Sequence, residues 1–225
     1  MTGKRVILLG ATGMVGGHVL RICLDDPDIS EVTVLGRRST GIGHNRLHEV
    51  IHEDFTDFSA VIDELAGQDA AIFCLGVYTG AVSDDEFRLI TVDYTVAFAE
   101  ALHNRSPHAA FCFLSGQGAD RTERSRIAFA RYKGAAENAL LNTGFPRVHI
   151  FRPGYIYPVT PRKEPNITYS ILRGMYPLIH RIYPNSSVSS DSLARAMVYA
   201  GIHGTGGFTG PILENRDIRE LVRRI

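Results

Sequence analysis

Near its start the chain reads Arg5-Val6-Ile7-Leu8-Leu9-Gly10-Ala11-Thr12-Gly13-Met14-Val15-Gly16. An apolar run of strand length passes into three glycines spaced three apart, and a helical pattern follows from residue 14 to residue 24. This strand–turn–helix context is the one that a dinucleotide-binding fingerprint requires. A tight strand–helix connection without a ligand is the alternative interpretation of a glycine-rich turn taken by itself.

Each glycine has a physical role in the fingerprint. Gly10 allows a sharp turn off the strand, Gly13 lets backbone approach a pyrophosphate, and Gly16 lets the helix pack close to the sheet. The helix start offers unpaired N–H groups and the positive end of the helix dipole to the phosphates. The sequence therefore predicts a cofactor contact made by the whole turn, which also includes Thr12, Met14 and Val15.

The bulk composition excludes several classes of protein. Apolar residues make up 44% of the 225 residues, as in a globular core. Lys plus Arg equals Asp plus Glu at 24 each, so no bulk charge favours nucleic acid or an anionic membrane. No apolar run reaches the length of a membrane span. The odd set of Cys23, Cys74 and Cys112 lies in apolar segments, which predicts reduced thiols and a cytoplasmic protein, and no motif predicts a metal site.

Strand-like and helix-like segments alternate along the chain, which predicts an α/β fold with a doubly wound, mostly parallel Rossmann-type sheet. The predicted strands span residues 5–9, 31–35, 48–52, 70–75, 110–114 and 147–151, and the predicted helices span 14–25, 59–66, 84–103 and 125–141. Further helical patterns lie at 168–182 and 190–202, before a short C-terminal helix. We expect one domain over residues 1–225, in which residues 155–210 form a small lobe that covers the carboxyl edge of the sheet.

The end of the second predicted strand indicates which dinucleotide is bound. Gly36 stands 20 residues after Gly16, where an NAD-binding protein usually has an Asp or Glu, and Arg37 and Arg38 follow it. A guanidinium accommodates a 2′-phosphate, which a carboxylate would repel. The sequence therefore predicts NADP(H) over NAD(H), with two solvated loop arginines as the alternative.

Two further segments are candidates for the adenosine end of the cofactor. Asp54 follows the third predicted strand and could accept a hydrogen bond from an adenine amino group, or could simply stabilise a turn. Leu75-Gly76 ends the fourth strand, where the small Gly76 would let backbone approach the ribose and pyrophosphate. A plain loop glycine is the alternative at that position.

The chain resembles the short-chain dehydrogenase/reductase superfamily, within it the atypical branch with NAD(P)H-binding, NmrA-like and Tat-interacting-protein-like members. The segments that carry the resemblance are Gly10-x-x-Gly13-x-x-Gly16, Leu35-Gly36-Arg37-Arg38, Cys74-Leu75-Gly76, Leu114-Ser115-Gly116-Gln117-Gly118-Ala119-Asp120, Lys133-Gly134 and Phe151-Arg152-Pro153-Gly154. The resemblance covers most of the chain, is firmest from residue 5 to about 155, and implies a nicotinamide cofactor on a Rossmann-type sheet.

The resemblance also implies a catalytic Ser, Tyr and Lys. Ser115 matches the serine that polarises a substrate carbonyl, and Lys133 matches the lysine that holds the nicotinamide ribose and lowers the pKa of the tyrosine. The tyrosine normally stands four residues before the lysine, but this chain has Phe129 there. The adjacent Tyr132 points about 100° away from Lys133 on a regular helix.

Three interpretations follow from Phe129. Tyr132 or another phenol, such as Tyr78 or Tyr155, could replace the missing tyrosine through a local change of geometry. Water or the substrate could supply the proton instead. Finally, the protein could bind the dinucleotide without turning it over.

Two functions therefore compete. The favoured one is an NADPH-dependent oxidoreductase that reduces a small carbonyl or other unsaturated substrate, because the covering lobe makes a substrate cavity plausible. The alternative is a catalytically degenerate regulatory protein that senses NADP(H) and binds a protein partner. The substrate is not readable from the sequence, and we expect no nucleic-acid or membrane partner. The long helices predicted at 84–103 and 125–141 could pair in a homodimer.

Overall fold

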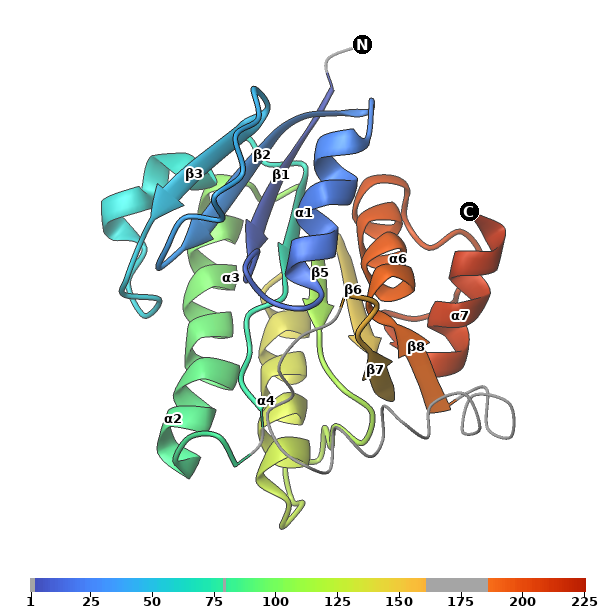
Figure 1. Cartoon of the computed structure of the whole chain (residues 1–225). Helices are drawn as coiled ribbons and strands as arrows, with labels where there is room; N and C mark the ends of the chain where they lie inside the picture. Colours follow the sequence, from blue (N-terminus) through green and yellow to red (C-terminus); the bar gives the residue numbers. More distant parts are fainter. Residues whose placement is uncertain (1–2, 79, 161–185) are drawn as a thin grey trace.

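The computed structural model describes residues 3–78, 80–160 and 186–225. Seven strands form one sheet in the order β3-β2-β1-β4-β5-β6-β9, and each neighbouring pair is parallel (Figure 1). The strands are β1 (Lys4–Leu9), β2 (Ile29–Gly36), β3 (Leu47–Ile51), β4 (Ala70–Phe73), β5 (Ala110–Leu114), β6 (Arg147–Arg152) and β9 (Ile212–Glu214). The prediction of a doubly wound, Rossmann-type α/β fold is confirmed.

Helices cover both faces of the sheet (Figure 1). On one face lie α1 (Gly16–Asp25), α6 (Ser190–His203) and α7 (Asn215–Arg224), and on the other lie the 3₁₀ helix η1 (Ser59–Leu65), α3 (Tyr94–Arg105) and α4 (Ala128–Asn142). Successive residues of β1 serve opposite cores, because Leu8 packs with the α1 and α6 side chains and Leu9 packs with those of α3 and α4. This burial on both faces explains why the strands are continuous apolar runs.

The helix predicted at 84–103 is one helical stretch in three parts. It consists of α2 (Asp84–Arg88), a π-helical turn (Leu89–Asp93) and α3. Ser83 caps its start by accepting a hydrogen bond from the Glu86 N–H. The helix predicted from residue 125 begins only at Ala128, because the Ser125 side chain accepts a hydrogen bond from the Ile127 N–H and holds a turn there.

Three short strands were not predicted. Besides β9, the strands β7 (Tyr155–Tyr157) and β8 (Ser187–Ser189) pair in parallel as a separate two-stranded sheet. Each of the three has three residues, which is too short for a hydrophobic period to identify. The helix predicted at 168–182 lies outside the described residues. Within residues 155–210, where a covering lobe is expected, the structure describes β7, β8 and α6. Because α6 packs on a face of the sheet beside α1, a lobe that covers the carboxyl edge stays a prediction.

The topology gathers candidate residues at one edge of the sheet. Because the strands are parallel, the carboxyl ends of β1, β4, β5 and β6 meet at the same edge. Gly10 follows β1, Cys74 follows β4, and Ser115 follows β5.

Candidate functional site

The glycine turn after β1 leaves no room for side chains at two positions. Gly10 has φ of +85°, and a Cβ there would lie 2.6 Å from the carbonyl carbon of Cys74. A Cβ on Gly16 would lie 2.1 Å from the carbonyl oxygen of Gly10. The Gly13 N–H donates to that same oxygen at 2.9 Å, and Gly13 itself is exposed. The turn is therefore closed by backbone contact, and its exposed middle can approach a ligand.

A cavity of ≈ 320 Å³, which we call the arginine cavity, adjoins this turn. Its lining residues are Gly10, Ala11, Thr12, Val34, Gly36, Arg37, Arg38, Phe55 and Leu75. Both guanidiniums are exposed, and within the described residues neither has a hydrogen-bond or ion-pair partner. Two unpaired cations beside the glycine turn suit an anionic group on a ligand.

Asp54 does not line the arginine cavity. Its carboxylate accepts hydrogen bonds from the Thr56 hydroxyl at 2.5 Å and the Thr56 N–H at 2.9 Å, and these bonds lower its pKa. This is the turn-stabilising role that the sequence left open. A contact with adenine stays a prediction for Asp54, whereas its neighbour Phe55 lines the cavity.

A second cavity, of ≈ 250 Å³, lies beyond the turn at the ends of β4 and β5, and we call it the lysine cavity. Its lining residues are Gly13, Met14, Val15, Cys74, Leu75, Gly76, Val77, Tyr78, Leu114, Ser115, Phe129, Lys133 and Ile156. The structure thus brings Ser115, Lys133 and Gly76 to the same space as the glycine turn. Residues far apart in the sequence meet there because their strands end at the same edge.

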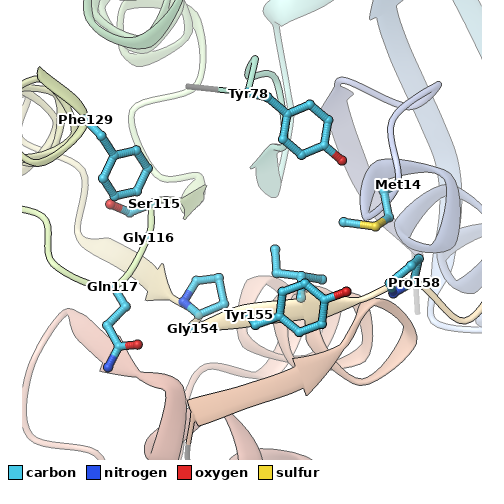
Figure 2. Close-up of a pocket in the computed structure, with 11 residues that line it drawn as sticks. Met14, Tyr78, Ser115, Gly116, Gln117, Phe129, Gly154, Tyr155 and Pro158 are labelled. Carbon is cyan, nitrogen blue, oxygen red and sulfur yellow. The ribbon is translucent and has the colours of Figure 1, made fainter. Parts of the chain in front are cut away.

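The third cavity, of ≈ 330 Å³, is the tyrosine cavity of Figure 2. It shares Met14, Tyr78, Ser115, Phe129 and Ile156 with the lysine cavity, and it adds Gly116, Gln117, Pro153, Gly154, Tyr155 and Pro158. The two cavities therefore adjoin at Ser115.

Lys133 is buried on α4 and faces the sheet. Its Nζ donates to the Leu114 carbonyl at 2.9 Å and lies 4.9 Å from the centre of the Phe113 ring. Burial lowers the pKa of Lys133 to about 8, while the negative charge of Glu137 opposes that shift. The ammonium has further protons to donate into the lysine cavity.

Ser115 is held by a buried ionic network that the sequence analysis missed. Its Oγ lies 2.5 Å from Oε1 of Glu137, which is 0% exposed. Arg152 binds the same carboxylate through Nε and Nη2, and its Nη1 donates to Glu214 at 3.0 Å. The available signal was the spacing of Glu137, four residues after Lys133, which places both on the buried face of α4.

The missing tyrosine is not replaced by Tyr132. The Tyr132 hydroxyl donates to Asp84 at 2.6 Å, and its ring packs against Phe87 of α2. Adjacent helical residues point in different directions, so Lys133 faces the cavity and Tyr132 faces α2. The structure therefore does not bring Tyr132 together with Ser115 and Lys133, which corrects its placement among the catalytic candidates.

Phe129, which stands where the family usually has a tyrosine, lines the tyrosine cavity. Its ring covers Gly116, where a Cβ would lie 2.5 Å from the ring carbon Cζ. Two other aromatic residues, Tyr78 and Tyr155, project into the same cavity from different elements (Figure 2). These are the two alternative phenols that the sequence offered.

Residues 10–201 match a protein family described as NAD(P)H-binding. The chain is 27% identical over 212 residues to "Protein fmp52, mitochondrial" of Aspergillus niger, with 90% of this chain and 88% of that protein covered. It is 30% identical over 158 residues to "Protein HTATIP2" of Rattus norvegicus, with 69% of this chain and 64% of that protein covered.

Among solved structures, an oxidoreductase of the short-chain dehydrogenase/reductase family from Burkholderia thailandensis has a TM-score of 0.68. The two chains are 18% identical over 95% of this chain and 91% of the other, which shows a shared fold.

Across the part of the chain that the structure describes, no helix is long and apolar enough to cross a membrane. The same residues include no group of three side chains suited to a metal ion.

Proposed function

Because this chain belongs to the NAD(P)H-binding family, we propose that it is an NADP(H)-dependent oxidoreductase that reduces a small carbonyl or other unsaturated substrate. The observation that carries the proposal is the line of three cavities from Arg37 and Arg38, past the glycine turn, to Ser115 and Lys133. Such a line suits an extended dinucleotide with its adenosine at one end and its nicotinamide at the other.

The residues present fit this cofactor. The exposed middle of the glycine turn, at Gly13, would take the pyrophosphate, and the unpaired arginines would take the 2′-phosphate. Lys133 would donate to the nicotinamide ribose from the lysine cavity. When bound, the cofactor supplies a hydride to the substrate. The tyrosine cavity would hold the substrate next to the lysine cavity.

The arginines give the first test. Replacing Arg37 or Arg38 with Ala should weaken NADPH binding by tenfold or more and leave NADH binding nearly unchanged, because a charged hydrogen bond contributes about 1.5–3 kcal/mol. Isothermal titration calorimetry with both cofactors measures this. The matched control is Arg105→Ala, because Arg105 is also exposed but pairs with Asp63 away from the cavity. Equal losses for NADPH and NADH would contradict the role of the arginines.

Lys133 predicts a pH dependence of binding. With a pKa of about 8 in the free protein, the side chain is an ammonium below pH 8 and a neutral amine above it. Since the ammonium is the stronger donor to a ribose hydroxyl, the dissociation constant of NADPH should rise about tenfold between pH 7 and pH 9.5. The Lys133→Met variant should bind more weakly at pH 7 and show a flat profile. A wild-type profile as flat as that of the variant would count against this role.

The proton for a reduced substrate must come from a group other than Phe129. Tyr78 and Tyr155 are the phenols that line the tyrosine cavity, and we propose that one of them donates its proton to the substrate oxygen. The test of turnover is NADPH oxidation with a panel of aldehydes, ketones and enones. No oxidation with any member, despite tight NADPH binding, would reject the reductase proposal.

A regulatory protein that senses NADP(H) is the second candidate, because Phe129 removes the usual proton donor. A sensor must bind NADPH and NADP⁺ with different affinities, since equal affinities shift no conformational equilibrium. Equal dissociation constants for the two forms would therefore exclude it.

The homodimer and any protein partner stay predictions. So does a cytoplasmic location, since the fmp52 relatives are named mitochondrial.

A further inference from the structure

The hydrogen bond between Ser115 and Glu137 has a defined direction. Arg152 donates to both carboxylate oxygens of Glu137, from Nε to Oε1 at 2.9 Å and from Nη2 to Oε2 at 2.5 Å. A guanidinium is always protonated in proteins, and this two-pronged contact fits an ionised carboxylate. A carboxylate only accepts hydrogen bonds. The proton between Ser115 Oγ and Glu137 Oε1, which are 2.5 Å apart, therefore belongs to Ser115.

Because of this direction, the Ser115 hydroxyl has only its lone pairs left to offer a ligand, and it can only accept hydrogen bonds from it. A hydroxyl has one proton, and the proton of Ser115 is committed to Glu137. Glu137 is 0% exposed and Ser115 is 6% exposed, so water has little access to replace that bond if the hydroxyl rotates. A rotation would exchange a charged hydrogen bond for a neutral one, which is the weaker of the two. The oxygen that lines both the lysine and the tyrosine cavities thus accepts hydrogen bonds.

We propose that Ser115 is a specificity-determining acceptor that selects substrates carrying an O–H or N–H donor beside the reacting atom. Glu137 and Arg152 act through Ser115 as positioning residues that fix its proton. The substrate class rests on the proposed function, whereas the state of Ser115 does not. In the family resemblance, by contrast, the serine donates to a substrate carbonyl. The donor to a carbonyl oxygen is then the phenol of the tyrosine cavity proposed above.

Neutron diffraction from deuterated crystals of the full chain tests the direction of the bond without any turnover. The deuterium on Ser115 Oγ should point at Oε1 of Glu137. A deuterium that points into the cavity overturns the proposal. This readout is independent of NADPH uptake, so it separates a failure of this inference from a failure of the proposed function.

Two probes test the selectivity, namely 2-hydroxycyclohexanone, which carries a hydroxyl donor beside its carbonyl, and cyclohexanone, which carries none. On the nucleotide-free protein, 2-hydroxycyclohexanone should bind about tenfold more tightly, the ratio expected when the added hydroxyl pairs with an acceptor that cyclohexanone leaves unpaired. The Ser115→Ala variant should bring the two dissociation constants together. Gln117→Ala, which removes a different polar side chain from the same cavity, should keep the preference.

Two results of the probe experiment would overturn the proposal. One is cyclohexanone binding to the wild type as tightly as 2-hydroxycyclohexanone. The other is a preference that disappears in Gln117→Ala and persists in Ser115→Ala. Ligand-observed NMR titrations with both probes measure the ratio directly and need no catalytic activity.

Discussion

The Gly16→Ala variant should lose NADPH binding by a hundredfold or more and unfold about 3 kcal/mol more easily than the wild type. The added methyl group would lie 2.1 Å from the carbonyl oxygen of Gly10, so the turn and the start of α1 must separate. That separation also displaces the Gly13 N–H, which donates to the same oxygen at 2.9 Å. Calorimetry with NADPH and urea unfolding measure the two effects.

The matched control is the neighbouring glycine of the same helix. A Cβ on Gly17 would lie 3.4 Å from the Ala11 carbonyl oxygen, which is ordinary van der Waals contact. Gly17→Ala should therefore bind NADPH like the wild type and gain up to about 1 kcal/mol from the better helix propensity of Ala. Wild-type NADPH affinity in Gly16→Ala would refute the close contact at the glycine turn.

The Glu137→Ala variant should lower the free energy of unfolding by about 3 kcal/mol, because it leaves the guanidinium of Arg152 without its buried partner. The side chain of Arg152 is only 13% exposed, so water cannot easily replace the carboxylate. Ser115 loses its acceptor in the same variant. Urea unfolding monitored by circular dichroism provides the measurement.

Glu214 provides the comparison, because it binds the same guanidinium from a side chain that is 47% exposed. Glu214→Ala should cost only about 1 kcal/mol, which includes the loss of its capping bond at the start of α7. Equal losses of unfolding free energy in Glu137→Ala and Glu214→Ala would show that the burial of a partner carboxylate does not decide how much its contact with Arg152 stabilises the protein.

The glycine turn and the alternation of strands and helices were predictable because both are local. The positive φ at Gly10 and the close packing at Gly16 both require glycine, so the turn is marked in the sequence by glycines at a fixed spacing. A strand that is buried on both faces requires apolar residues throughout, so it is marked by an apolar run. The three-residue strand β9 escaped prediction, since it exists only because β6 offers it a hydrogen-bonding edge. Its sequence has no period that could identify it.

The sequence by itself determined a parallel sheet, a glycine turn at its first strand, and two arginines after its second strand. It also determined that Ser115 ends a strand and that Lys133 lies on a helix. Only the tertiary structure decided which way the side chains point. It turned Tyr132 toward Asp84, placed Phe129 over Gly116, and joined Glu137 to Arg152 and Ser115. Contacts of this kind join segments many residues apart, and their geometry depends on how the helices pack on the sheet rather than on any local pattern.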